Sequence, residues 1–192
     1  MEIAELIRLL ENVARTGTVT EIDEEKWRVR VQSGGLETTW LRWTAQRAGA
    51  FKVWVPPSIG EQVWFLCLGG NTDVAFIGGS LYSDDNPAPG ATRKEMVMTA
   101  PDGAKFRYDA EAGALQVKGI KSAVVEASVK ITLDTPEVEC TNLLTTKKLN
   151  VTEGGEMRGD ITHRGGSLSS NGKVLHSHRH PGDSGGQTGE PL

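Results

Sequence analysis

The stretch that decides the fold is residues 149–175, LNVTEGGEMRGDITHRGGSLSSNGKVL, near the end of a 192-residue chain. It is close to a repeat at intervals of ten or eleven residues, in which Val151-Thr152 recurs as Ile161-Thr162, Gly154-Gly155 as Gly165-Gly166, and Met157 as Leu168. This period is shorter than the roughly 20–50 residues of solenoids in which one chain completes each coil. We therefore expect each chain to contribute one strand per turn to a triangular prism shared with two other copies.

The same region lacks aromatic residues. All tryptophan, phenylalanine and tyrosine residues lie between Trp27 and Tyr108, so residues 109–192 contain none. Such a segment has little with which to fill a core of its own. It is either a flexible tail or it packs against copies of itself, and its alternating aliphatic residues favour the second alternative. Short strands are expected at 115–117, 129–133 and 149–151.

Residues 18–82 have instead the pattern of a small β-barrel. Alternating apolar and polar residues predict half-buried antiparallel strands, and the continuous apolar run Val63–Leu68 predicts a central strand buried on both faces. Strands are expected at 27–32, 36–43, 63–68, 73–77 and 81–82. This spacing indicates an oligonucleotide/oligosaccharide-binding (OB) barrel, with tryptophan and phenylalanine side chains filling its interior.

A short amphipathic helix is expected before the barrel. Its apolar residues follow the spacing of heptad a and d positions, and the helix should end near Gly17. They are Ile3, Leu6, Leu10 and Val13. The helix either packs on its own domain or meets its copies around a symmetry axis, and two heptads do not decide between these alternatives.

After the barrel, residues 84–90 (DDNPAPG) have the composition of a linker. We place a domain boundary there. A hairpin is expected to follow it, with its turn at Pro101–Gly103 and apolar residues on both arms.

Composition excludes some functions. The net charge is −4 with both signs mixed along the chain, which argues against a partner held by nucleic-acid phosphates. No segment approaches the length of a transmembrane helix and no signal peptide is recognisable, so synthesis in the cytoplasm is expected. Cys67 and Cys140 are expected to be reduced core residues without a disulfide.

All four histidines lie in the last thirty residues, and three form the run His176-Ser177-His178-Arg179-His180. In an extended strand the three imidazoles would project to one side. Two histidines from each of three chains would give six nitrogen donors, an octahedral set that suits Fe(II), Co(II) or Ni(II) better than zinc. The alternative is a solvated polar tail. His163 stands alone and is expected to be exposed.

These motifs resemble baseplate assembly protein V, the central spike of temperate contractile-tailed phages, and the similar spike of R-type pyocins. The N-terminal half carries the resemblance at residues 39–43 (TWLRW), 60–63 (GEQV) and 82–87 (YSDDNP). The C-terminal half carries it at 133–138 (LDTPEV), 169–176 (SSNGKVLH) and 180–186 (HPGDSGG).

The resemblance implies a homotrimer with an OB-fold collar, a triple-stranded β-helix shaft and a pointed tip. In that family an HxH motif from each chain holds one iron ion on the axis. The best match is His178 and His180, directly before Pro181, while His176 is a third candidate that leaves the register open. The implied function is mechanical: the spike closes the tail tube, contacts the baseplate hub, and is driven through the target cell's outer membrane when the sheath contracts. The particle would be assembled in the host cytoplasm and then released.

The expected fold is therefore all-β with a short N-terminal helix. The expected segments are 1–15 (helix), 16–90 (OB-fold domain), 91–175 (β-helix shaft) and 176–192 (metal-binding tip). Two other functions compete. A metal-dependent hydrolase needs an open coordination position and a nearby base, which the histidine run does not offer, so no catalytic residues are expected. An OB module that binds nucleic acid conflicts with the net charge. The sequence leaves phage and pyocin as alternatives.

Overall fold

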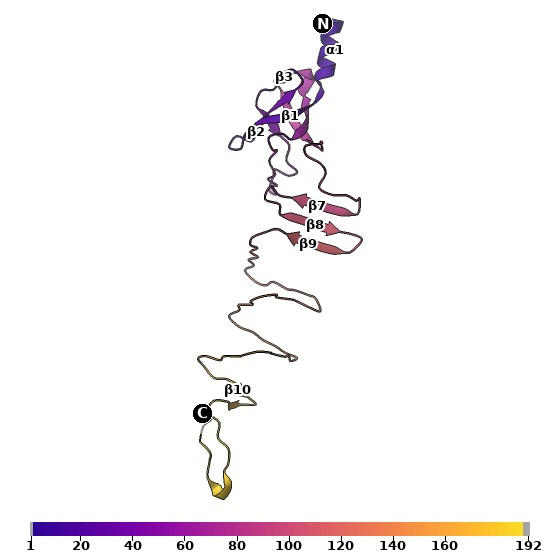
Figure 1. Ribbon diagram of the computed structural model, residues 1–192. Coiled ribbons are helices and arrows are strands. Elements are labelled where there is room, and N and C mark those ends of the chain that lie inside the picture. Colours follow the sequence, from indigo (N-terminus) through magenta and orange to yellow (C-terminus); the bar gives the residue numbers. More distant parts are fainter. Residues whose placement is uncertain (1, 190–192) are drawn as a thin grey trace. The chain divides into compact units, whose positions relative to one another are not determined.

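The computed structural model describes residues 2–189, which form a mostly β structure with one α-helix (Figure 1). The first elements are α1 (Ile3–Asn12), β1 (Ala14–Asp23), β2 (Arg28–Ser33), β3 (Leu36–Glu37), β4 (Leu41–Trp43), β5 (Gln62–Cys67), the 3-10 helix η1 (Leu68–Gly70) and β6 (Ala75–Leu81). They are followed by β7 (Glu95–Thr99), β8 (Lys105–Asp109), β9 (Ala114–Lys118), β10 (Ser169–Ser170), β11 (Lys173–Val174) and the 3-10 helix η2 (Asp183–Gly185).

The chain divides into two compact units, Met1–Glu126 and Ala127–Leu192. The linker expected at 84–90 contains no helix or strand, but it lies inside the first unit. This division into two units does not test the four segments expected from the sequence, which remain predictions. Residues 1 and 190–192, which belong to the expected helix and tip, lie outside the described part of the chain.

Five strands of the first unit close into a barrel. β1 pairs with both β2 and β5, and the circuit is completed by β5–β6, β6–β4 and β4–β2. The β4–β6 pair is parallel and the other pairs are antiparallel. A five-stranded closed barrel of this kind is the architecture of the OB fold, so the sequence-based expectation is confirmed.

The barrel core consists mostly of aliphatic residues around one phenylalanine, Phe65, so the expectation of phenylalanine in the interior is met at this position. Its buried members are Val19, Val29, Val31, Leu41, Val63, Phe65, Cys67 and Ile77. The prediction that tryptophans fill the barrel is wrong: Trp27 and Trp54 are more than half exposed, and Trp43 packs only against the core's edge. β5 is also buried on one face only, because Trp64 points outward over Gly78, where an added Cβ would overlap the indole ring. A barrel this narrow has room for valine but not for several indoles.

Three expectations for the barrel strands differ from the structure. The strands expected at 73–77 and 81–82 form one strand, β6. Trp27 has a φ of 58° and belongs to the turn between β1 and β2, so the strand begins at Arg28. The strand expected at 36–43 is divided into β3 and β4. It is interrupted because Thr38 is buried and exchanges hydrogen bonds with Val31, its amide donating to the Val31 carbonyl and its Oγ1 accepting from the Val31 amide.

The helix α1 ends at Asn12, earlier than predicted, because the chain enters β1 at Ala14 to pair with β5. Gly17 does not stop the helix. It lies inside β1 where a Cβ would collide with the Gln32 carbonyl of β2, so glycine permits the close approach of the two strands. Within residues 2–189 no helix has the length and apolar character required to span a bilayer.

β7, β8 and β9 form a separate antiparallel sheet of three strands. The hairpin predicted across Pro101–Gly103 is confirmed, with Gly103 at a φ of 86°. The short strand predicted at 115–117 is β9, which pairs with β8 of its own chain.

Between β9 and β10 the chain runs back and forth in extended passes joined by bends (Figure 1). The strands predicted at 129–133 and 149–151 are not formed within the single chain, and no backbone hydrogen bond joins any two residues of 119–167 in the described structure. Cys140 is exposed here, so the prediction of a core position is wrong for the single chain, whereas Cys67 is buried; both thiols are free.

Candidate functional site

The histidine-bearing end of the chain begins with a tight hairpin. β10 pairs with β11 across Asn171 and Gly172, whose φ values are 50° and 75°. Asn-Gly is the favoured pair for a two-residue turn that needs positive φ at both positions. The pair Asn171-Gly172 is therefore a sequence signal for a hairpin that the expected strands did not include.

A second fold-back closes the tip. The amide of Gly182 donates to the carbonyl of Gly186 at 2.7 Å, and Pro181 bridges to Gln187. The His180 amide donates to Oγ1 of Thr188, and the Thr188 amide donates back to the His180 carbonyl, both at 2.9 Å. The backbone of His180 is therefore held through both its amide and its carbonyl, and the small residues after it turn back towards it.

This fold-back brings two imidazoles together. Nε2 of His178 lies 3.1 Å from Nε2 of His180, and the rings meet edge to face with centroids 4.9 Å apart. Nδ1 of His178 lies 2.7 Å from the carbonyl oxygen of Leu175. Because a carbonyl only accepts, this Nδ1 carries the hydrogen, which leaves Nε2 of His178 with its lone pair.

The pair fits a metal ion that takes nitrogen ligands. With metal–nitrogen bonds of about 2.1 Å, donors at adjacent corners of an octahedron are about 3.0 Å apart, and donors on a tetrahedron about 3.4 Å. The observed 3.1 Å is close to the octahedral value. No group of three or more histidine, cysteine or acidic side chains that could hold a metal occurs among residues 2–189. Within the described residues, one chain therefore brings together two imidazole nitrogens and no third side chain of these types.

The other two histidines lie apart from this pair. His176 sits in the turn formed by residues 175–177 and is exposed, so the expectation of three imidazoles on one face of an extended strand is wrong. The turn breaks the alternation that the expectation assumed. His163 is exposed, as expected.

A second notable surface is one face of the β7–β9 sheet. Two cross-strand rows run over it, one through Met96, Tyr108 and Leu115 and one through Met98, Phe106 and Val117. All six side chains are between 38% and 72% exposed. A sheet face that is apolar and exposed in this way is typical of a surface that packs against a partner in the assembled protein.

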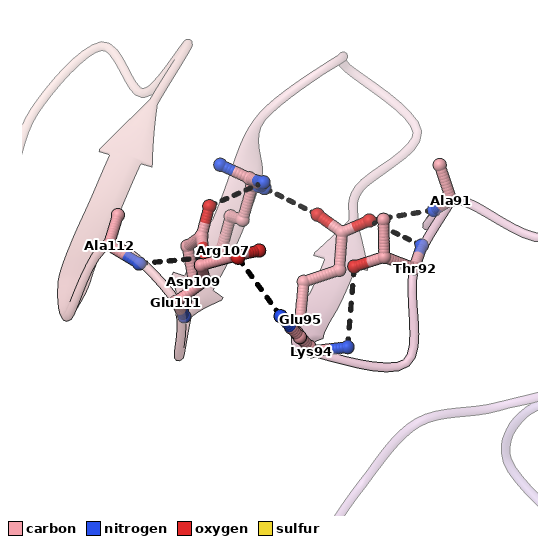
Figure 2. A network of polar contacts seen from close by, with 8 residues as sticks. All are labelled: Ala91, Thr92, Lys94, Glu95, Arg107, Asp109, Glu111 and Ala112. Carbon is pink, nitrogen blue, oxygen red and sulfur yellow. Dashed lines mark hydrogen bonds and ion pairs between the residues drawn. The ribbon is translucent and has the colours of Figure 1, made fainter.

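The opposite face carries a network of polar contacts (Figure 2). Arg107 bridges two carboxylates, with Nε 2.6 Å from Glu95 Oε2 and Nη2 2.9 Å from Asp109 Oδ2. The other oxygen of Glu95 accepts hydrogen bonds from the backbone amides of Ala91 and Thr92, at 2.7 and 3.0 Å. Glu95 thereby ties the segment before β7 to the sheet.

These contacts change the acidity of both carboxyl groups. The amide of Ala91, then Arg107 and the amide of Thr92, lower the pKa of Glu95 to about 2. The pKa of Asp109 is also lowered, chiefly by hydrogen bonds from the amides of Ala112 and Glu111. Sequence reasoning missed this network, although the alternation in 95–99 places Glu95 on the face opposite to Met96.

Comparison with known proteins agrees with this architecture. Residues 15–82 match the family model of the type VI secretion system/phage-baseplate injector OB domain, and residues 119–171 match the phage spike trimer family. The spike protein of Escherichia phage P2 is 50% identical over 205 residues, which cover 99% of this chain and 97% of the relative. The role that follows is structural, not enzymatic. The chain therefore belongs to the phage spike protein family, whose members are part of the tail baseplate.

Proposed function

We propose that the protein is the membrane-piercing central spike of a contractile tail, either of a phage or of an R-type pyocin. It acts as a homotrimer with one iron ion at its tip, closes the tail tube at the baseplate hub, and punctures the outer membrane of the target cell. The observation that carries this proposal is the large apolar and hydrogen-bonding surface that a single chain leaves uncovered between residues 95 and 168.

The apolar face of the β7–β9 sheet supports a trimer. Three copies arranged around an axis with these faces inward would bury Met96, Phe106 and Leu115 of each chain together. The network around Arg107 would then remain outside, in contact with water. This division of the sheet into an apolar and a charged face is typical of strands that pack on one side only.

Residues 119–168 support the same arrangement. Backbone amide and carbonyl groups of an extended chain need partners. Residues 119–167 form no backbone–backbone hydrogen bond with one another, and within them threonine hydroxyls reach only the carbonyls of Glu137 and Lys148. Most of its aliphatic side chains, among them Val129, Ile131 and Leu133, are more than half exposed in the single chain. Two further copies would supply both strand partners and apolar cover, which leaves no free strand edge along the shaft.

At the tip, the convergence of His178 and His180 supports a metal bound on the axis. Two imidazoles from each of three chains would complete six nitrogen ligands, and iron is the metal that the family resemblance implies. The Leu175 carbonyl orients His178, and Thr188 holds the backbone of His180. The ion would be structural: it ties three chain ends together at the point where strands would otherwise fray.

The mechanism is penetration by a rigid body. Sheath contraction supplies the force, and the narrow tip concentrates it on a small area of membrane. The three chains must not separate under this load, which the shared shaft and the metal tie both oppose. The run of residues 176–180 contains no carboxylate that could act as a general base beside a metal-bound water.

The proposal is tested on purified full-length protein. Native mass spectrometry should give three chains, and elemental analysis should give one iron per three chains. The double variant His178→Ala/His180→Ala should lose the iron and remain trimeric, whereas His163→Ala, which removes an exposed lone histidine, should keep it. A folded monomer, or zinc at one ion per chain, would contradict the proposal.

A further inference from the structure

The helix α1 leaves its apolar side uncovered. Ile3, Leu6, Ile7 and Leu10 are between 49% and 78% exposed, although they lie on one side of a regular helix. One of the two alternatives drawn from the sequence was that the helix packs on its own domain. The single chain does not cover these four side chains in that way. A helix of ten residues is only marginally stable in water without such packing.

The end of α1 is nevertheless fixed to the barrel. Arg15 of β1 donates from Nη1 to Asn12 Oδ1 at 2.6 Å, and from Nε and Nη2 to the hydroxyl and carbonyl of Ser33 at 3.0 and 3.1 Å. Gly70 of η1 lies so close to the backbone of Leu9 that a Cβ would overlap it. The last turn of α1 is thus held in place. Because this attachment fixes the orientation of the helix on the barrel, it also fixes the direction in which the uncovered apolar side faces.

From this geometry we infer that the uncovered side of α1 packs against α1 of two other copies, forming a short parallel three-helix coiled coil at the N-terminal end of the spike. This inference rests on the proposed trimer and adds a second point at which the chains are joined. The occupant is another copy because Ile3, Leu6, Leu10 and Val13 have the a–d spacing that makes identical helices pack in layers.

Charge and tethering support this occupant. The ion pair of Arg8 with Glu5, 2.7 Å long, lies off the a–d seam, so a parallel trimer would bury no charge. Ile3 at a with Leu6 at d is the combination typical of two strands, whereas Leu10 at a with the β-branched Val13 at d is closer to that of three or four strands. The seam residues alone therefore do not set the number of helices, which follows from the proposed trimer. Helices whose barrels already sit in one trimer meet at a high effective concentration, which makes a helix of ten residues sufficient.

The test uses cysteine variants of the full-length protein in a Cys140→Ser background. Leu10→Cys and Leu6→Cys place a thiol on the seam, and Arg8→Cys places one on the outer side of the same helix. Each is treated with a short bifunctional maleimide, and native mass spectrometry is recorded on the same samples. We expect the reagent to link the chains covalently in both seam variants and not in Arg8→Cys. Native mass spectrometry should give three chains per particle for all three variants.

The outcomes separate this inference from the proposed function. A trimer without linkage in the two seam variants would mean that α1 faces a different partner, and the inference would be wrong while the spike trimer stands. Equal linkage in all three variants would show that the helices do not keep a seam, which also overturns it. A monomeric protein would overturn the proposed trimer and this inference together.

Discussion

Glu95 shows how one carboxylate links this fold to pH. Its side chain is 7% exposed, and its pKa of about 2 lies below the ordinary value of 4.5. A group with a depressed pKa in the folded state stabilises that state at pH values above its ordinary pKa. The contribution is lost as the pH falls from 4.5 towards 2.

The first prediction follows from this sign. Wild-type protein should lose thermal stability as the pH is lowered from 4.5 to about 2, and Glu95→Gln should lose less over the same range because it has no carboxylate to protonate. At neutral pH the variant should be the less stable, since Arg107 loses one of its two partners. The measurement is the thermal unfolding midpoint at several pH values.

The control for this experiment is Glu111→Gln. Glu111 forms an exposed ion pair with Lys94, and its side chain is 71% exposed, so little effect is expected. Equal pH profiles for wild type and Glu95→Gln would contradict the prediction.

Single residues also show where prediction from sequence succeeded and where it failed. The family resemblance pointed to His178 and His180 as the pair, whereas the histidine spacing left His176 as a third candidate. The turn at 175–177, which takes His176 out of the extended run, is not revealed by the alternation of residues. The alternation did predict that Val29 and Val31 face the core. It did not assign Trp64, because both Trp64 and Phe65 are apolar and only the glycines of β6 show which ring lies outside.

At the scale of elements, the barrel and the β7–β8 hairpin were predictable because their strands pair within one chain. The segment 119–168 was not, because the partners of its backbone groups lie in other copies if the proposed trimer is correct. Its aliphatic alternation is nevertheless specific enough to assign faces. In an extended chain, residues two apart point to the same side, so Cys140 shares a face with Val138.

The second prediction uses this face. In the native trimer Cys140 should be protected from thiol reagents, because it would point with Val138 into the shared core. Cys67 should also be unreactive, since burial raises the pKa of its thiol. Denaturation should expose both. The measurement is thiol titration before and after unfolding.

Its matched control is Glu139→Cys in a Cys140→Ser background, because residue 139 lies on the opposite side of the extended chain. That thiol should react in the native protein. Reaction of Cys140 at full stoichiometry in the intact trimer would show that the assigned face is wrong.

The third prediction concerns the apolar face of the β7–β9 sheet. Leu115→Asp should weaken the trimer strongly, because three carboxylates would meet in a shared apolar core. Leu115 is 72% exposed in the single chain. If the protein worked as a monomer, the substitution should therefore change its free energy of unfolding by no more than about 0.5 kcal/mol. Sedimentation at decreasing protein concentration distinguishes the two cases.

Gln116→Asp is the control on the adjacent residue. Gln116 lies on the other face of β9, opposite Arg107 in register, where a carboxylate is compatible with the network. It should leave the trimer intact. Equal sedimentation of the two variants would argue against burial of the apolar face.

At the scale of the whole molecule, the folding of the barrel and the folding of the second unit depend on association with other copies to different degrees. The barrel has a core of its own, with all eight buried members between Val19 and Ile77. In the second unit, by contrast, none of the described residues is buried. A segment without buried residues has no apolar gain to offset the entropy of ordering its backbone, so it cannot fold as a single chain.

The fourth prediction is therefore that the two parts behave differently as fragments. A fragment of residues 14–90 should fold cooperatively as a monomer, with an unfolding midpoint independent of protein concentration. A fragment of residues 119–192 should acquire β-structure only together with a mass of three chains, and its midpoint should rise with concentration and with added Fe(II). Circular dichroism and sedimentation on the same samples provide the measurement. If the second fragment were a folded monomer at micromolar concentration, the shaft would not need its copies, and the uncovered aliphatic residues of 119–168 would require a different explanation.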